Sequence, residues 1–117
     1  MRRSVLAYLA DIVDCCDAIA ATLDGVDLAT YETNRMVRSA VEREFTIIGE
    51  AVNHLSKLDP ETAARITHAR MIVGFRNLLV HDYPAIVDSA VWAIARNDAP
   101  MLRVECATIL EELQSKR

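Results

Sequence analysis

Residues 34–57 decide the fold of this chain, and they read NRMVRSAVEREFTIIGEAVNHLSK. Their apolar side chains recur at steps of four or three residues, at Val37, Val41, Phe45, Ile48, Val52 and Leu55. This spacing places all of them on one face of an α-helix. Thr33 and Asn34 are both suitable N-caps, so the sequence predicts a helix that begins near Thr33 or Asn34 and ends near Lys57.

The stretch from Ser4 to Leu23 keeps the same rhythm. Its apolar positions are Val5, Leu9, Ile12, Cys16, Ile19 and Leu23. Asp24-Gly25 is expected to end this helix, because glycine accepts the left-handed conformation at a helix end, and a loop is expected through Asp27. The two apolar faces are long enough to lie against each other, so we expect two long antiparallel helices as the backbone of the fold.

The second half of the chain divides at its prolines. Asp59-Pro60 is typical of an N-cap followed by proline at the first helical position, which predicts a short helix to about Ile66. The next helix is expected from about Ala69 to Val80, and Pro84 prevents its continuation because proline has no N–H to donate. Its inward-facing side chains are expected to be Ile72, Phe75 and Leu79, flanked by Met71 and Leu78.

A last helix is expected to begin at a cap formed by Asp88-Ser89, and Pro100 is expected to kink or split it. The composition favours helices throughout, since 52% of the residues are hydrophobic, only 5% are aromatic, and there are just 3 glycines. A chain of 117 residues is short for two domains. We therefore predict one all-α domain over residues 1–117, a small antiparallel bundle of about five helices.

The three cysteines fit neither a disulfide framework nor a metal site. Cys15 and Cys16 are neighbours in a predicted helix, which leaves Cys106 as the only distant partner. An odd, low count without metal-ligand spacing is typical of a reducing cytoplasm. Asp11 and Asp14 interrupt the first apolar stretch too early for a secretion signal or a membrane span. The chain is expected to be cytoplasmic, with no metal and no cofactor, and it contains no glycine-rich phosphate loop.

Charge is distributed unevenly along the chain. The net charge of −4 disfavours a broadly basic surface that coats nucleic acid. Residues 62–81, however, contain no acid, so their three arginines give this window a charge of +3 while the remaining residues carry −7. Arg65 and Arg70 are therefore candidate phosphate-binding residues beside Arg76. The alternative is that these arginines are solvated surface charges.

The densest chemistry lies in residues 74–84, which read GFRNLLVHDYP. Arg76 and His81 are five positions apart, which separates them by about 140° around a regular helix, so they would not share a face. Two arrangements bring them together. Either the helix loosens near its end and His81 turns back, or the same segments of two subunits face each other across a dyad.

An arginine and a histidine in one cleft suit phosphodiester cleavage without a metal ion. Arginine stays charged and matches phosphate oxygens, while histidine passes protons near neutral pH. In RNA cleavage of this type a base deprotonates the 2′-hydroxyl, its oxygen attacks phosphorus, and a cation stabilises the added charge. Asn77 is expected to orient the phosphate, and Tyr83 to stack or position a hydroxyl. Composition and spacing alone predict no more than a helical domain with an anion site. The alternative to a catalytic role is that Arg76 and His81 cap the helix and stabilise its dipole.

Read as Arg-x4-His-x-Tyr, residues Arg76, His81 and Tyr83 resemble the motif of the HepT toxins, a branch of the HEPN-domain ribonucleases. Residues 47–51, IIGEA, resemble the second-helix signature of that family. Val91-Trp92 followed by Asp98-x-Pro100 resembles the C-terminal segment of that family. The stretch 68–73 departs from the family, which usually has a tryptophan there.

The resemblance implies a HEPN-like homodimer whose facing motifs form a composite RNA-cleaving cleft, with Arg76 and His81 as catalytic residues. It also implies the toxin of a toxin–antitoxin pair, whose partner is a minimal nucleotidyltransferase antitoxin that attaches AMP to Tyr83. The alternative is a non-catalytic subunit that binds a nucleotide or RNA and serves only as the docking site and substrate of the nucleotidyltransferase. Glu44 and Glu50 lie in the second long helix, and a buried one of the two is a candidate partner for Arg76.

Overall fold

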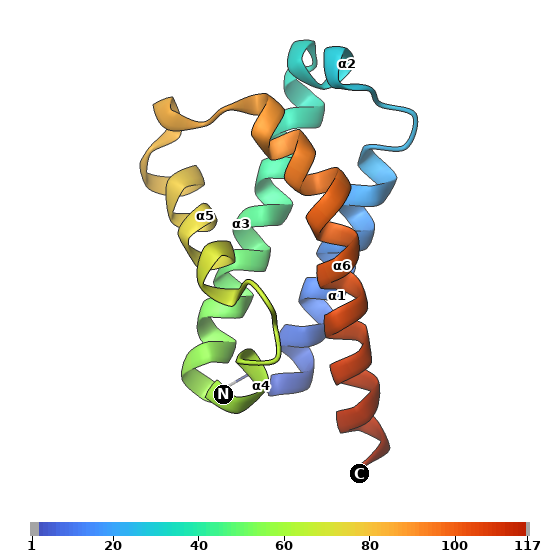
Figure 1. The fold of residues 1–117 in the computed structure, drawn as a ribbon, viewed down its shortest axis with the longest axis vertical. Helices are drawn as coiled ribbons and strands as arrows, with labels where there is room; N and C mark the ends of the chain where they lie inside the picture. The colour runs from blue at the N-terminus through green and yellow to red at the C-terminus, as the bar shows by residue number, and fades with distance from the viewer. Residues whose placement is uncertain (1–2, 117) are drawn as a thin grey trace.

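Helices α1, Val5–Thr22, and α3, Arg35–Leu58, form the long antiparallel pair that the sequence predicts. The computed structural model in Figure 1 describes residues 3–116. Ser4 caps α1 by accepting a hydrogen bond from the backbone N–H of Ala7, and Asn34 caps α3 by accepting one from Val37, both at 3.1 Å. The buried core of the pair includes Leu9, Ile12, Ile19, Val41, Ile48, Val52 and Leu55.

Helix α6, Asp88–Ser115, packs along α1, which contacts both α3 and α6 extensively, whereas α3 and α6 contact each other little. Its N-cap is Val87 and not the expected Asp88-Ser89, because Asp88 already lies in the first helical turn. There the Asp88 carboxylate pairs with Arg38 at 3.6 Å and interacts favourably with the positive end of the helix dipole. The helix is not split at Pro100, which is exposed, because a single proline removes only one backbone hydrogen bond of the helix.

Two short helices differ from the sequence prediction. Helix α2, Leu28–Thr33, is capped by Asp27, whose carboxylate accepts from Thr30 N–H at 2.8 Å, and it buries Tyr31. Six residues are too few to show a helical period, so this helix was not predicted. Helix α4, Pro60–Ala63, begins at the predicted cap but ends before Ile66. The described residues thus form six α-helices, rather than about five, and no strand.

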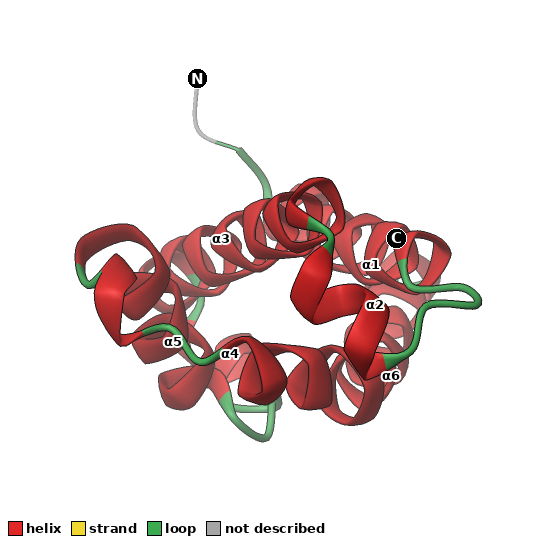
Figure 2. Cartoon of the chain, turned by 90° about the horizontal axis from the view of Figure 1, so that it is seen from above, coloured by secondary structure: helices red, strands yellow, loops and turns green. Residues whose placement is uncertain are grey.

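Helix α5, Ala69–His81, packs mainly against α3, and a short 3₁₀ helix η1, Tyr83–Ala85, connects it to α6. Figure 1 shows α5 to one side of α3 and α6 to the other, and Figure 2 shows both on the same face of the α1–α3 pair. A cavity of about 210 Å³ lies between them. Leu79 is buried as predicted, whereas Ile72 and Phe75 are only partly buried because they line this cavity.

All three cysteines are buried and free of disulfide bonds, namely Cys15, Cys16 and Cys106. Burial raises the pKa of Cys16 and Cys106 to about 12, which keeps both thiols protonated at neutral pH. Among the described residues, no helix combines the length and the apolar character that crossing a membrane requires.

Candidate functional site

Arg76 is held against α3 by two neighbouring residues of that helix. Gly49 is the first, because a Cβ at its position would lie 2.7 Å from Cγ of Arg76, still closer to Cβ of Arg76, and 3.3 Å from the backbone oxygen of Ile72. Glycine therefore permits the close approach of α5 to α3 at this point. Glu50 is the second, and its Oε1 accepts a hydrogen bond from Nη2 of Arg76 at 3.3 Å.

The guanidinium of Arg76 also contacts its neighbour in the sequence. Nη1 of Arg76 donates to Oδ1 of Asn77 at 3.0 Å. This bond fixes the orientation of the Asn77 amide, so its NH₂ group remains free to donate outward. Nε of Arg76 is buried and has no hydrogen-bond partner in the described part of the chain. Glu50 and Asn77 together orient the charged group, and Glu50 partly balances its charge.

His81 is the last residue of α5, and its side chain is exposed. The helix does not loosen before it, because the N–H of Asp82 still donates to the carbonyl of Leu78 at 3.0 Å. The first of the two arrangements that would join Arg76 and His81 is therefore wrong. His81 lies one helical turn beyond Asn77 on the outer face of α5, whereas Arg76 is turned toward α3. Within residues 3–116 no hydrogen bond links Arg76 to His81.

Tyr83 lies directly after this helix end, at the start of η1, and it is 69% exposed. Val80 and Val87 are exposed near it in the sequence. The phenol hydroxyl is therefore accessible to another macromolecule.

Residues 62–81 contain no acid, but in the structure acidic side chains from α6 lie next to them. Arg65 pairs with Glu112 of α6 at 2.6 Å, and Thr67 donates a hydrogen bond to Glu105. Arg70 is exposed and makes no salt bridge within the described residues. It lies in the first turn of α5, six residues and thus about 9 Å from Arg76 along the helix at 1.5 Å per residue. The structure therefore does not bring Arg65 and Arg70 to the Arg76 guanidinium.

Of the two candidate partners Glu44 and Glu50, Glu50 pairs with Arg76. Its side chain is 46% exposed and not buried as expected. Glu44 instead lies beside Cys15, where it adds to the effect of burial in raising the pKa of that thiol. The role of Gly49 was not predicted. A glycine inside a long helix was the available signal, because such a glycine weakens the helix unless close packing requires it.

A metal site does not emerge from the described residues, because no group of three or more His, Cys, Asp or Glu side chains is placed to hold an ion. The second half of α5 and the start of η1 carry a cation, an amide, an imidazole and a phenol, contributed by Arg76, Asn77, His81 and Tyr83. Such a set can bind a phosphate and move a proton.

Comparison with known proteins assigns the family. The family model described as Ribonuclease HepT-like matches residues 12–109. "Putative RNase MJ1380" of Methanocaldococcus jannaschii is 32% identical over 89% of this chain and 94% of its own length. "Putative RNase MJ0125" of the same organism is 29% identical over 98% of both chains. "Putative RNase TTE0752" of Caldanaerobacter subterraneus subsp. tengcongensis is 26% identical over 90% of this chain and 93% of its own length. No solved structure matches significantly. This chain belongs to the HepT-like ribonuclease family.

Proposed function

We propose that this member of the HepT-like ribonuclease family cleaves RNA without a metal ion, with Arg76 and His81 as its catalytic residues. The orientation of the Arg76 guanidinium carries the proposal, because Glu50 and Asn77 fix it by hydrogen bonds of 3.3 and 3.0 Å. His81 is exposed one turn beyond Asn77. An oriented cation and an accessible imidazole at the same helix end are the groups that this cleavage needs.

In the proposed reaction, a neutral His81 imidazole takes the proton of the RNA 2′-hydroxyl. The 2′-oxygen then bonds to the adjacent phosphorus, and the bond from phosphorus to the 5′-oxygen of the next nucleotide breaks. Water gives a proton to that leaving 5′-oxygen, and the hydroxide left behind takes the proton from the His81 imidazolium, so the products are a 2′,3′-cyclic phosphate and a 5′-hydroxyl. Arg76 donates hydrogen bonds to the non-bridging oxygens, whose negative charge grows during the attack.

Asn77 and Tyr83 position the substrate in this scheme. Because Oδ1 of Asn77 accepts from Arg76, the Asn77 NH₂ group is left to donate to a phosphate oxygen. The exposed ring of Tyr83 offers a face on which a base can stack. Arg65 and Arg70 lie toward the other end of α5, so the phosphates they would bind belong to a more distant part of the RNA backbone.

Two copies of the chain complete the proposed site. Within one copy Arg76 is turned toward α3 while His81 is on the outer face of α5. A second copy whose motif faces the first brings its own His81 to the Arg76 of the first, so the reaction requires a HEPN-like homodimer with a composite cleft.

The proposal extends to control of the activity. The chain acts in the cytoplasm as the toxin of a toxin–antitoxin pair, and its partner is a minimal nucleotidyltransferase antitoxin. The Oη of Tyr83 attacks the α-phosphorus of ATP, the phenol loses its proton to a base of the partner, and pyrophosphate leaves. The attached AMP adds a negative charge and bulk two residues from His81, where it competes with the RNA phosphate. The exposure of Tyr83 supports this step.

A binding-only role is the second candidate, and two observations favour it. Glu50 partly balances the charge of Arg76, and no hydrogen bond links Arg76 to His81 in one copy. In that case the pocket holds a nucleotide or RNA without cutting it, and the chain is only docked and modified by the nucleotidyltransferase.

RNA cleavage by the purified chain in EDTA separates the two candidates. The catalytic role predicts that the wild type shortens RNA and that Arg76→Ala and His81→Ala abolish both cleavage and growth arrest. Arg103→Ala is the matched control, since Arg103 is an exposed arginine of α6 that pairs with Asp17 of α1. Intact RNA at high protein concentration, with tight RNA binding retained, would show that the chain only binds.

A further inference from the structure

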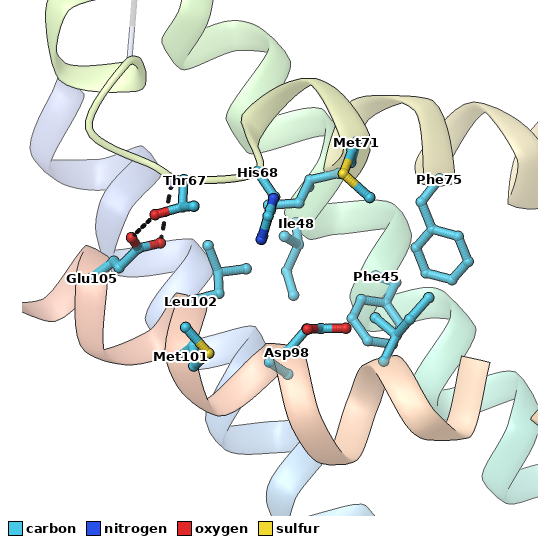
Figure 3. Close-up of a pocket in the computed structure, with 13 residues that line it drawn as sticks. Phe45, Ile48, Thr67, His68, Met71, Phe75, Asp98, Met101, Leu102 and Glu105 are labelled. Atoms are coloured by element: carbon cyan, nitrogen blue, oxygen red, sulfur yellow. Dashed lines mark hydrogen bonds between the residues drawn. The ribbon is translucent and has the colours of Figure 1, made fainter. Parts of the chain in front are cut away.

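A polar cavity lies between α1 and α3, apart from the apolar groove beside α5. The groove between α5 and α6 holds the cavity drawn in Figure 3, to which α3 contributes Phe45 and Ile48. The polar cavity is also about 210 Å³ in volume, and α3 contributes Glu50 and His54 to its lining. At about 100° per residue these two pairs lie on opposite sides of α3. The polar cavity therefore faces away from the groove.

Aromatic rings form one wall of the polar cavity. The rings of Tyr8 and His54 are stacked almost in parallel, with their centroids 5.5 Å apart and their planes at 10°. The guanidinium of Arg3 lies over the Tyr8 ring, with its Cζ 5.4 Å from the ring centroid. His54 is exposed, so the stack is open to a further flat ring. Aromatic surfaces of this kind hold nucleic-acid bases, since every base has a π-face.

The charged side chains that line the polar cavity are already paired. Nη2 of Arg3 donates to Oδ2 of Asp11 at 2.6 Å, and Glu50 pairs with Arg76 at 3.3 Å. Among the described lining residues no unpaired arginine remains, so the cavity suits an uncharged base better than a phosphate group. Glu50 both lines the cavity and contacts Arg76. A base in the cavity and a phosphate at Arg76 are therefore one side chain apart, as in one nucleotide or two adjacent ones.

The pair between Arg3 and Asp11 leaves hydrogen-bonding groups free at the cavity. Within residues 3–116, Oδ1 of Asp11 accepts no hydrogen bond, and Nε and Nη1 of Arg3 donate none. A carboxylate can accept two parallel N–H bonds, and an arginine can donate to a carbonyl oxygen. Guanine presents the complement on one edge, because its N1–H and 2-amino groups donate and its O6 accepts. Adenine and cytosine present one donor group there, and uracil presents one between two oxygens that a carboxylate repels.

We propose that the polar cavity is a guanine subsite for the RNA substrate, beside the phosphate that Arg76 holds. The base lies against the rings of Tyr8 and His54. Asp11 accepts from the N1–H and 2-amino groups of guanine, and Arg3 donates to O6. The chain consequently cuts RNA next to guanosine. The place of the subsite beside the scissile phosphate rests on the proposed RNA cleavage, whereas the recognition of guanine stands on the cavity itself.

Inosine in place of guanosine tests the subsite, because inosine keeps O6 and N1–H but lacks the 2-amino group. The probes are two RNA oligonucleotides that differ only in a single guanosine or inosine, and end-labelling maps where each is cut. The wild type is expected to cut next to guanosine, with kcat/KM about tenfold or more above that for the inosine RNA. Equal cleavage of the two RNAs, or cleavage away from guanosine, would overturn the proposal.

Asp11→Asn tests the residue that reads the base. The asparagine side chain has one acceptor oxygen and an NH₂ group, so the variant is expected to cut the two RNAs at similar rates. Asp17→Asn is the matched control, because Asp17 is an exposed acid of α1 that pairs with Arg103, and it is expected to keep the preference for guanosine. Circular dichroism verifies that both variants are folded. A preference retained by folded Asp11→Asn would contradict the assignment.

Binding of 2′-O-methyl RNA keeps the guanine subsite apart from the cleavage reaction. The methyl group replaces the hydrogen of the attacking 2′-hydroxyl, so these probes bind without being cut. Fluorescence anisotropy of the wild type is expected to give a Kd for the guanosine probe about tenfold or more below that for the inosine probe. Equal Kd values would overturn the subsite, whereas a preference without cleavage of unmodified RNA refutes only the proposed function. Tighter binding of free GMP than of the guanosine probe would assign the cavity to a free nucleotide and overturn the proposal.

Discussion

Replacing Gly49 by alanine tests how the structure holds Arg76. The added Cβ would lie 2.7 Å from Cγ of Arg76, closer still to its Cβ, and 3.3 Å from the backbone oxygen of Ile72, whereas ordinary contacts lie at 3.4–4 Å. Neither arginine atom is the far end of a flexible side chain, so α5 must move away from α3. The pair between Arg76 and Glu50 is expected to break with that movement.

The magnitude follows from two opposing effects. Overpacking costs about 1–3 kcal/mol, and the short distances place this site in the upper half of that range. Alanine gains about 1 kcal/mol over glycine inside a helix. The expected loss in the free energy of unfolding is therefore about 1–2 kcal/mol, measured by urea titration of the helical circular dichroism signal. RNA cleavage is expected to fall at least about tenfold, because the oriented cation is displaced.

Gly74→Ala provides the matched control for stability. No atom lies within 4 Å of a Cβ at Gly74, so this helical glycine has no packing role within the chain. Its replacement is expected to raise the free energy of unfolding by about 0.5–1 kcal/mol. Equal shifts for Gly49→Ala and Gly74→Ala would refute the close approach of α5 to α3 at Gly49.

Further predictions concern the neighbours of the motif. Glu50→Gln is expected to change the free energy of unfolding by less than about 1 kcal/mol, because the pair between Glu50 and Arg76 is half exposed. It is expected to lower kcat for RNA with little change in KM, and an unchanged kcat would contradict the positioning role of Glu50. Tyr83→Phe is expected to melt like the wild type and to resist the nucleotidyltransferase, so AMP detected by mass on the variant would contradict the assigned site. Burial, and next the charge of Asp88, raises the pKa of Glu42 above its ordinary value of 4.5. Because the ionised Glu42 carboxylate is disfavoured in the folded state, it destabilises the fold. This destabilisation is absent below pH 4.5 and grows as the pH rises through the higher pKa of the folded state. Glu42→Gln is accordingly expected to stabilise the fold at neutral pH and not in acid. Urea titrations at several pH values measure the difference in the free energy of unfolding between variant and wild type, and a difference that does not change with pH would contradict this prediction.

The long helices could be predicted because their signals are local and repeated. Six apolar residues at steps of four and three define the face of α3, and Asn34 caps it as expected. Helix α2 has no room for such a period, and its cap Asp27 was assigned to a loop. Asp88 shows another limit, because its pairing with Arg38 depends on a residue fifty positions away in the sequence.

The candidate site could be predicted in its residues but not in its geometry. The motif spacing identified Arg76, Asn77, His81 and Tyr83, and the periodicity of a regular helix correctly separated Arg76 from His81. Charge summed along the sequence was a poor guide, because Glu112 reaches Arg65 from the end of α6. Tertiary packing also left the groove beside α5 open, and no local pattern indicated it.

Mixing two inactive variants tests the composite site most directly. Arg76→Ala and His81→Ala chains are each assayed for RNA cleavage in EDTA, and then together after the subunits have exchanged. Each variant alone is expected to be inactive, and the mixture to regain cleavage, because a heterodimer brings the intact Arg76 of one chain to the intact His81 of the other. A wild type that cuts RNA while the exchanged mixture remains inactive would contradict a site built from two copies.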